Sequence, residues 1–164
     1  MNPESWGFIG TLVGAIVGAS ASILATMINS KNAIRIQEKI EKDARKERFR
    51  NFQRDNLLEL QELLTHTLRL IVKAHFVDLE NYKKGIKWRE SKLNTKLDNE
   101  ISDSFREMSI KSERIEKDEL RNEIIELRRK MNECLCADSY EVGQVMLKNL
   151  IEKFDDLMPK LGKE

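Results

Sequence analysis

"WGFIGTLVGAIVGASASILATMI", residues 6–28, decides the fold expected for this chain of 164 residues. The stretch runs for 23 residues without a charged side chain. A helix of this length rises about 35 Å at about 1.5 Å per residue, which is enough to cross a hydrocarbon core about 30 Å thick. The sequence therefore predicts a membrane-spanning helix at residues 6–28, preceded by a short extracytoplasmic segment at residues 1–5.

A cleaved export signal is the alternative interpretation, with residues 19–21 (Ala-Ser-Ala) as the cleavage site. Such signals begin with a positively charged region, whereas Glu4 is the only charged side chain before the apolar run. The run also continues past the cleavage site, through Ile23 and Met27. These features favour a retained span, with Trp6 as an anchor at the membrane interface.

The basic residues around the span predict its orientation. None precedes it, and nine follow closely: Lys31, Arg35, Lys39, Lys42, Arg45, Lys46, Arg48, Arg50 and Arg54. Because Lys and Arg collect on the cytoplasmic side of a span, we expect the C-terminal domain to lie on the cytoplasmic side of a bacterial inner membrane. Residues 29–55 are expected to form a basic juxtamembrane helix near anionic head groups, so that membrane lipid is one partner.

The predicted span has two unlike faces. At 100° per residue, most of its glycine, alanine, serine and threonine residues share one half of the helix. An unbroken ridge at i, i+4 spacing runs along that half: Gly10, Gly14, Gly18, Ser22 and Thr26. Such ridges let membrane helices approach closely, so we expect homo-oligomers, as trimers, tetramers or larger rings. The plain alternative is that small residues are common in spans and this one is only an anchor.

The rest of the chain reads as all-α, because only three glycines and Pro159 interrupt a sequence rich in helix-forming residues. One apolar stripe recurs at spacings of three and four: Leu57, Leu60, Leu64, Leu68, Ile71, His75, Leu79 and Tyr82. Gly85 is expected to cap the end of this helix. Further helices are predicted at about 89–108, at about 113–136, and from Asp138 or Ser139 to near Met158. We therefore expect residues 56–164 to form a cytoplasmic three- to four-helix bundle.

The sequence carries little sign of catalysis. Cys134 and Cys136 form a lone C-x-C without further metal ligands, and His66 and His75 fall on opposite helix faces. His75 lies in the apolar stripe, which is typical of a hydrogen-bonded core histidine. No nucleophile–base pattern or phosphate-binding glycine loop is present. We therefore expect no enzymatic activity, no cofactor and no metal site.

An anionic ligand is the binding partner that the soluble part favours. The net charge of +1 argues against coating duplex DNA, but "YKKGIKWRE" (residues 82–90) interleaves cations with aromatic rings. Its candidate ligand-binding residues are Lys83, Lys84, Lys87, Trp88 and Arg89. A second candidate set shares one face of the long helix: His66, Arg69 and Lys73. The plain alternative for the first set is a solvated loop whose tryptophan packs on the bundle, and for the second an ordinary surface. The basic cluster at residues 128–130 is interpreted as a helix surface.

In overall plan, with one N-terminal span and a small helical cytoplasmic domain, the chain resembles the small membrane effectors of bacterial antiphage defence. Among these are the type III CRISPR effectors gated by cyclic oligoadenylate. The resemblance covers layout and length. It implies that cytoplasmic basic residues at subunit contacts bind a cyclic oligonucleotide, and that membrane perturbation or pore formation is the output.

Two other classes stay open. A membrane-anchored scaffold or stator without ligand gating would be similar to the peripheral-stalk b subunit of rotary ATP synthases. A phage inner-membrane spanin also has one N-terminal span and a helical domain of this size. That reading places the domain in the periplasm, which the basic residues after the span oppose.

Overall fold

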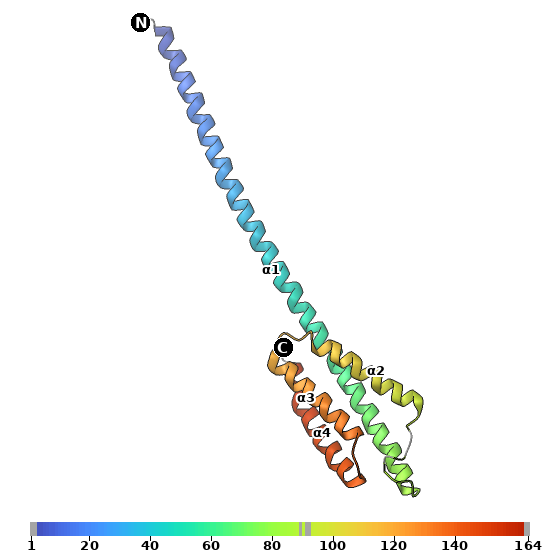
Figure 1. The fold of residues 1–164 in the computed structure, drawn as a ribbon. Coiled ribbons are helices and arrows are strands. Elements are labelled where there is room, and N and C mark those ends of the chain that lie inside the picture. The colour runs from blue at the N-terminus through green and yellow to red at the C-terminus, as the bar shows by residue number, and fades with distance from the viewer. Residues whose placement is uncertain (1–2, 89, 91–92, 163–164) are drawn as a thin grey trace. The chain divides into compact units, whose positions relative to one another are not determined.

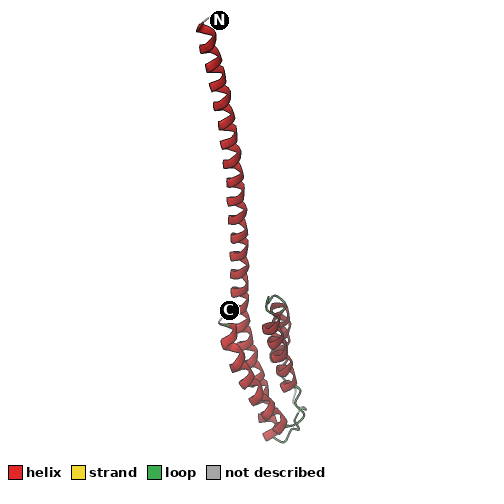
Figure 2. Ribbon diagram, turned by 90° about the vertical axis from the view of Figure 1, so that its left-hand side faces the viewer, coloured by secondary structure: helices red, strands yellow, loops and turns green. Residues whose placement is uncertain are grey.

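The protein folds as four α-helices, in a computed structural model that describes residues 3–88, 90 and 93–162. In chain order they are α1 (Pro3–Lys83), α2 (Thr95–Ser112), α3 (Asp118–Leu135) and α4 (Tyr140–Leu161) (Figure 1). The described residues contain no strand (Figure 2). The predicted all-α class is therefore confirmed. The chain divides into two compact units, Met1–Phe49 and Arg50–Glu164.

The first unit is helical over all its described residues and contributes no packed core. Apart from half-buried Ala44, every described side chain from Gly7 to Phe49 is exposed. Its apolar part reaches a mean hydropathy of 1.9 over 18 residues, and among the described residues this is the one helix long and apolar enough to cross a membrane. The backbone has no break at residue 28, so the predicted span continues directly into the predicted juxtamembrane helix.

The second unit packs the C-terminal part of α1 against α2, α3 and α4. Its main core is built from leucine, isoleucine and methionine side chains on all four helices: Leu57, Leu60, Leu64, Ile71, Met108, Ile124, Leu127, Met131, Leu150 and Leu157. A smaller cluster joins α1 to α2 through Leu70, Ala74, Leu97 and Ile101. The apolar stripe predicted from Leu57 onward is therefore the buried face of α1, although Leu68 and Leu79 are half-buried and Tyr82 is exposed.

Side chains from α1 also hold the connection between α2 and α3. Gln53 Nε2 donates to the carbonyl oxygen of Arg114 at 2.8 Å, and Asn56 Nδ2 donates to that of Lys111 at 3.1 Å. Arg114 lies just after α2, and the Lys111 carbonyl also accepts from the Arg114 backbone amide at 3.2 Å, so the two side-chain amides hold the turn that follows α2. The bundle is thus tied to α1 by polar contacts as well as by its core.

Three predicted boundaries of the second and third helices were wrong. The second helix begins at Thr95 instead of about residue 89, because Asn94 caps it by accepting from the Lys96 amide at 2.9 Å. It also continues beyond Met108 to Ser112, whose side chain is buried. The third begins at Asp118 instead of about residue 113, with two acidic residues in its first turn, where the helix dipole favours them.

The fourth helix begins as predicted and ends later than predicted. Ser139 caps it by accepting from the Val142 amide at 3.3 Å. It runs through Pro159 to Leu161 instead of ending near Met158. A proline in the last turn removes a single hydrogen bond, and Leu161 is buried against the core, which compensates for that loss. Gly85 has a φ of +86°, so the predicted glycine lies just beyond the end of α1 in the left-handed region.

Candidate functional site

The small ridge of the predicted span lies on one continuous helix. A Cβ atom added at Gly10, Gly14 or Gly18 would meet no other atom within 4 Å. The chain's own packing therefore gives no reason for glycine at these positions. Ser22 and Thr26 are exposed as well. The ridge is free to contact another molecule along its described length.

Two threonine hydroxyl groups of this face bond back onto their own helix. Thr11 Oγ1 donates to the carbonyl oxygen of Gly7 at 2.7 Å, and Thr26 Oγ1 donates to that of Ser22 at 2.8 Å. Both donors are thus satisfied within the helix, which suits an apolar environment. Their oxygens can still accept a hydrogen bond from a neighbouring helix.

The aromatic residues of the 82–90 stretch form a cluster with α1 and α4. The Trp88 ring lies 5.3 Å from His75, 6.1 Å from Tyr82 and 5.7 Å from Tyr140, measured between ring centroids, each in an edge-to-face arrangement. Tyr82 and Tyr140 stack at 5.6 Å. Trp88 is half-buried by these contacts. The tryptophan therefore packs onto the bundle, as in the plain alternative interpretation of this stretch.

His75 and Gly143 pack against Trp88 in this aromatic cluster. The His75 side chain is 6% exposed, and its Nε2 lies 3.2 Å from Nε2 of Gln144. Burial lowers the pKa of His75, which the nearby Asp78 carboxylate partly opposes. A Cβ at Gly143 would lie 3.1 Å from Trp88 Cζ2 and 3.2 Å from His75 Cε1, so only glycine fits there without displacement. His75 is a hydrogen-bonded core residue, as the apolar stripe predicted.

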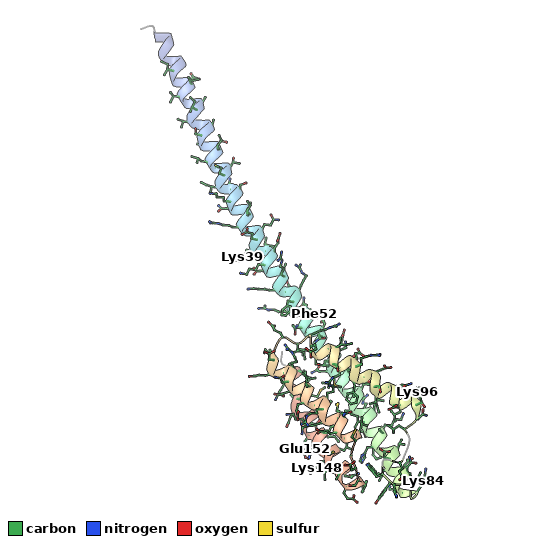
Figure 3. The ribbon with its side chains drawn as sticks, in the orientation of Figure 1. Lys39, Phe52, Lys84, Lys96, Lys148 and Glu152 are labelled. Atoms are coloured by element: carbon green, nitrogen blue, oxygen red, sulfur yellow. The ribbon has the colours of Figure 1, made fainter. Side chains whose placement is uncertain are left out.

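The predicted cations of this stretch lie outside the aromatic cluster. Lys83, Lys84 and Lys87 are exposed, and Lys84 projects from the end of the bundle where α1 ends (Figure 3). Lys87 Nζ is 3.9 Å from a carboxylate oxygen of Glu90. Arg89 lies outside the described residues. The structure thus packs the indole of Trp88 against His75, Tyr82 and Tyr140, while these three lysines are exposed.

His66 and Arg69 line one shallow cavity of about 330 Å³ on α1, whereas Lys73, although exposed, is not part of its lining. Glu62 lines the same cavity. His66 also borders a second cavity of about 380 Å³, where Lys111 is ion-paired with Glu59. Carboxylates therefore accompany the cations at this predicted set, which makes it a poor anion site.

Sequence reasoning missed a more suitable cavity between α2 and α3. It has a volume of about 510 Å³ and combines apolar, cationic and amide side chains: Phe105, Arg106, Ser109, Ile125, Arg128, Arg129 and Asn132. The signal was present in part, since residues 125, 128, 129 and 132 follow helical spacing on one face of α3. The facing residues of α2 could not be assigned without the packing of the two helices. We call this cavity the arginine groove.

The cysteines differ in their surroundings. Cys134 is buried in the core, and burial raises the pKa of its thiol to about 11, whereas Cys136 is exposed. Within the described residues, no three His, Cys, Asp or Glu side chains gather in a way that could hold a metal ion. Both cysteines are free thiols.

Comparisons with protein-family models, with curated proteins and with solved structures found no match for this chain. The chemistry of the described surfaces is therefore the basis for a functional assignment. These surfaces comprise an apolar helix with an exposed face of small residues, and a helical bundle with a cavity rich in arginine.

Proposed function

We propose that this protein is a single-pass membrane protein that self-assembles through its N-terminal helix, and whose cytoplasmic bundle senses an anionic ligand or partner. Ligand binding is expected to change the packing of the spans and to perturb or permeabilise the membrane. The observation that carries the proposal is the ridge at Gly10, Gly14 and Gly18, where the chain's own packing leaves the glycines without a neighbour. Close helix contacts within a bilayer use such surfaces.

The charge distribution supports a cytoplasmic bundle. Basic residues follow the apolar helix and none precedes it, and Lys39 extends from this basic part of α1 (Figure 3). Reporter fusions at the C-terminus test the orientation. We expect a C-terminal fluorescent protein to fluoresce and a C-terminal alkaline phosphatase to be inactive. Phosphatase activity would instead place the bundle in the periplasm, as the spanin-like alternative requires, and would contradict the proposal.

Membrane perturbation is tested with the full chain in vesicles that contain a trapped dye. The resemblance to antiphage effectors makes cyclic oligoadenylates the first ligands to try, and we expect dye release only when the ligand is present. The triple variant with Lys84, Lys87 and Arg89 replaced by Glu tests whether the 82–90 stretch contributes. Equal release with and without every ligand tried, or none at all, would contradict gating.

A scaffold or stator without ligand gating is the second candidate function. The first unit favours it, since its helix continues from the predicted span through the basic residues up to Phe49 without a break. This alternative predicts stable assembly together with vesicles that stay sealed under all conditions. The dye-release experiment therefore separates the two candidates.

A further inference from the structure

The arginine groove contains three guanidinium groups, and two of them are already neutralised. Arg106 Nη2 lies 2.9 Å from a carboxylate oxygen of Asp103. Arg129 pairs with Glu126, Nη2 to Oε1 at 2.7 Å, and also with Glu133. The hydrogen bond between Arg129 and Glu126 lowers the pKa of that glutamate and raises that of the arginine, so both groups are charged at neutral pH.

Arg128 differs from these two arginines because its partner is neutral. Its Nη1 donates to the hydroxyl oxygen of Ser109, and the structure records no carboxylate paired with it among the described residues. The Ser109 hydroxyl in turn donates to the carbonyl oxygen of Phe105 at 2.9 Å, so its oxygen is fixed as an acceptor. A guanidinium has five N–H donors, and most of those on Arg128 therefore have no recorded acceptor. The Ser109 hydroxyl on α2 therefore orients the Arg128 guanidinium, and its positive charge remains available to an anionic ligand.

Apolar side chains form the other part of the groove. Phe105 and Ile125 are half-buried and line it, and Phe105 also packs against the core. Its volume of about 510 Å³ falls within the range of small-molecule pockets, about 300–1,000 Å³. A bare inorganic anion would leave the apolar lining in water, whereas an uncharged apolar molecule would leave the arginine charge unmatched.

We propose that the arginine groove binds an organic anion, in which a single phosphate or carboxylate pairs with Arg128 and an apolar body covers Phe105 and Ile125. This inference rests on the proposed function in one respect, that the bundle is the ligand-binding part of the chain. The proposed ligand-binding site then lies between α2 and α3 instead of in the 82–90 stretch. The apolar body of the ligand is an aromatic ring or an alkyl chain, because either one would cover the apolar side chains that line the groove.

The test is equilibrium dialysis of the full chain in lipid nanodiscs, with empty nanodiscs subtracted. The probes are 2-naphthyl phosphate for a ring and octyl phosphate for a chain, and inorganic phosphate is added as a competitor. We expect at least one organic phosphate to bind and inorganic phosphate at the same concentration not to displace it. Arg128→Gln should weaken binding at least about tenfold, since a hydrogen bond between charged groups has roughly that effect.

Two matched variants separate the groove from general electrostatics. Arg129→Gln removes the same charge from the neighbouring, ion-paired position and should change the affinity less than about threefold. Ser109→Ala keeps the Arg128 charge but removes the hydroxyl that orients it, so it should weaken binding by less than Arg128→Gln does, and it keeps the site testable if Arg128→Gln proves too unstable to assay. Equal losses in the Arg128 and Arg129 variants, loss in Ser109→Ala alone, or no binding above empty nanodiscs would each overturn the site. None of these results affects the orientation or assembly of the span, which are measured separately.

Discussion

The glycines of the N-terminal helix and Gly143 of the bundle have different surroundings. In the apolar N-terminal helix, a side chain at Gly10, Gly14 or Gly18 would meet no neighbour within 4 Å. In the bundle, a side chain at Gly143 would press on Trp88 and His75 at 3.1–3.2 Å. The bundle thus uses Gly143 to complete its own packing, whereas the described packing of the N-terminal helix does not require glycine at these three positions.

The largest expected effect is a loss of stability when Gly143 of the bundle is replaced. Gly143→Val should lower the free energy of unfolding of the bundle by about 2 kcal/mol, because the added methyl groups overpack the aromatic cluster. Denaturant unfolding in mild detergent, followed by Trp88 fluorescence in a Trp6→Phe background, measures this change. The matched control is Gly14→Val in the same background, for which we expect a change within about 0.5 kcal/mol. Equal destabilisation by both substitutions would remove the distinction between the two regions.

A smaller effect is expected on the pH dependence of stability, through His75 in the same aromatic cluster. Burial lowers the pKa of His75 below its ordinary value of 6.5, so the unfolded chain binds a proton more readily than the folded one. The stability that His75 contributes is therefore present above about pH 6.5 and is lost as the pH falls through its folded pKa. Thermal unfolding from pH 8 to pH 5 should show a falling melting temperature, and His75→Gln should flatten that slope. An unchanged slope in the variant would assign the pH dependence to other groups.

The smallest expected effect concerns thiol chemistry, because it leaves the fold intact. Cys136 is exposed, whereas Cys134 is buried and its pKa is raised to about 11. At pH 8, a thiol reagent should label Cys136 within minutes and leave Cys134 unmodified until the bundle is unfolded. Mass spectrometry of the labelled peptides, with Cys136→Ser as the control, measures this. Rapid labelling of Cys134 in the folded protein would show that the core around it opens easily.

Local patterns in the sequence were enough to predict the fold class, because helix signals lie close together along the chain. The stripe from Leu57 to Ile71, the cap at Ser139 and the glycine after α1 all depend on neighbours within a few residues. The predicted start of α2 was wrong because an asparagine such as Asn94 can lie inside a helix or at its end. Only the hydrogen bond that its side chain accepts in the folded protein shows that it is the cap.

The candidate sites were predicted less well, because they depend on contacts between distant residues. The sequence leaves Trp88 open as a ligand-binding residue or as a side chain that packs on the bundle, because its partner Tyr140 lies on α4, far along the chain. Arg128 was interpreted as a surface residue, although its contact with Ser109 places it in a groove. Charge and aromaticity are visible in a sequence, whereas the neighbours that neutralise or cover them are not.

The central claim, that the small face of the N-terminal helix assembles this protein, is tested most directly by its mass in detergent. Multi-angle light scattering of the full chain, corrected for bound detergent, should give a trimer or a larger assembly. Gly14→Leu and Gly18→Leu should lower that mass, and Val13→Leu on the opposite, bulky face should leave it unchanged. A monomeric native protein, or an assembly of the same mass in all four proteins, would contradict the claim.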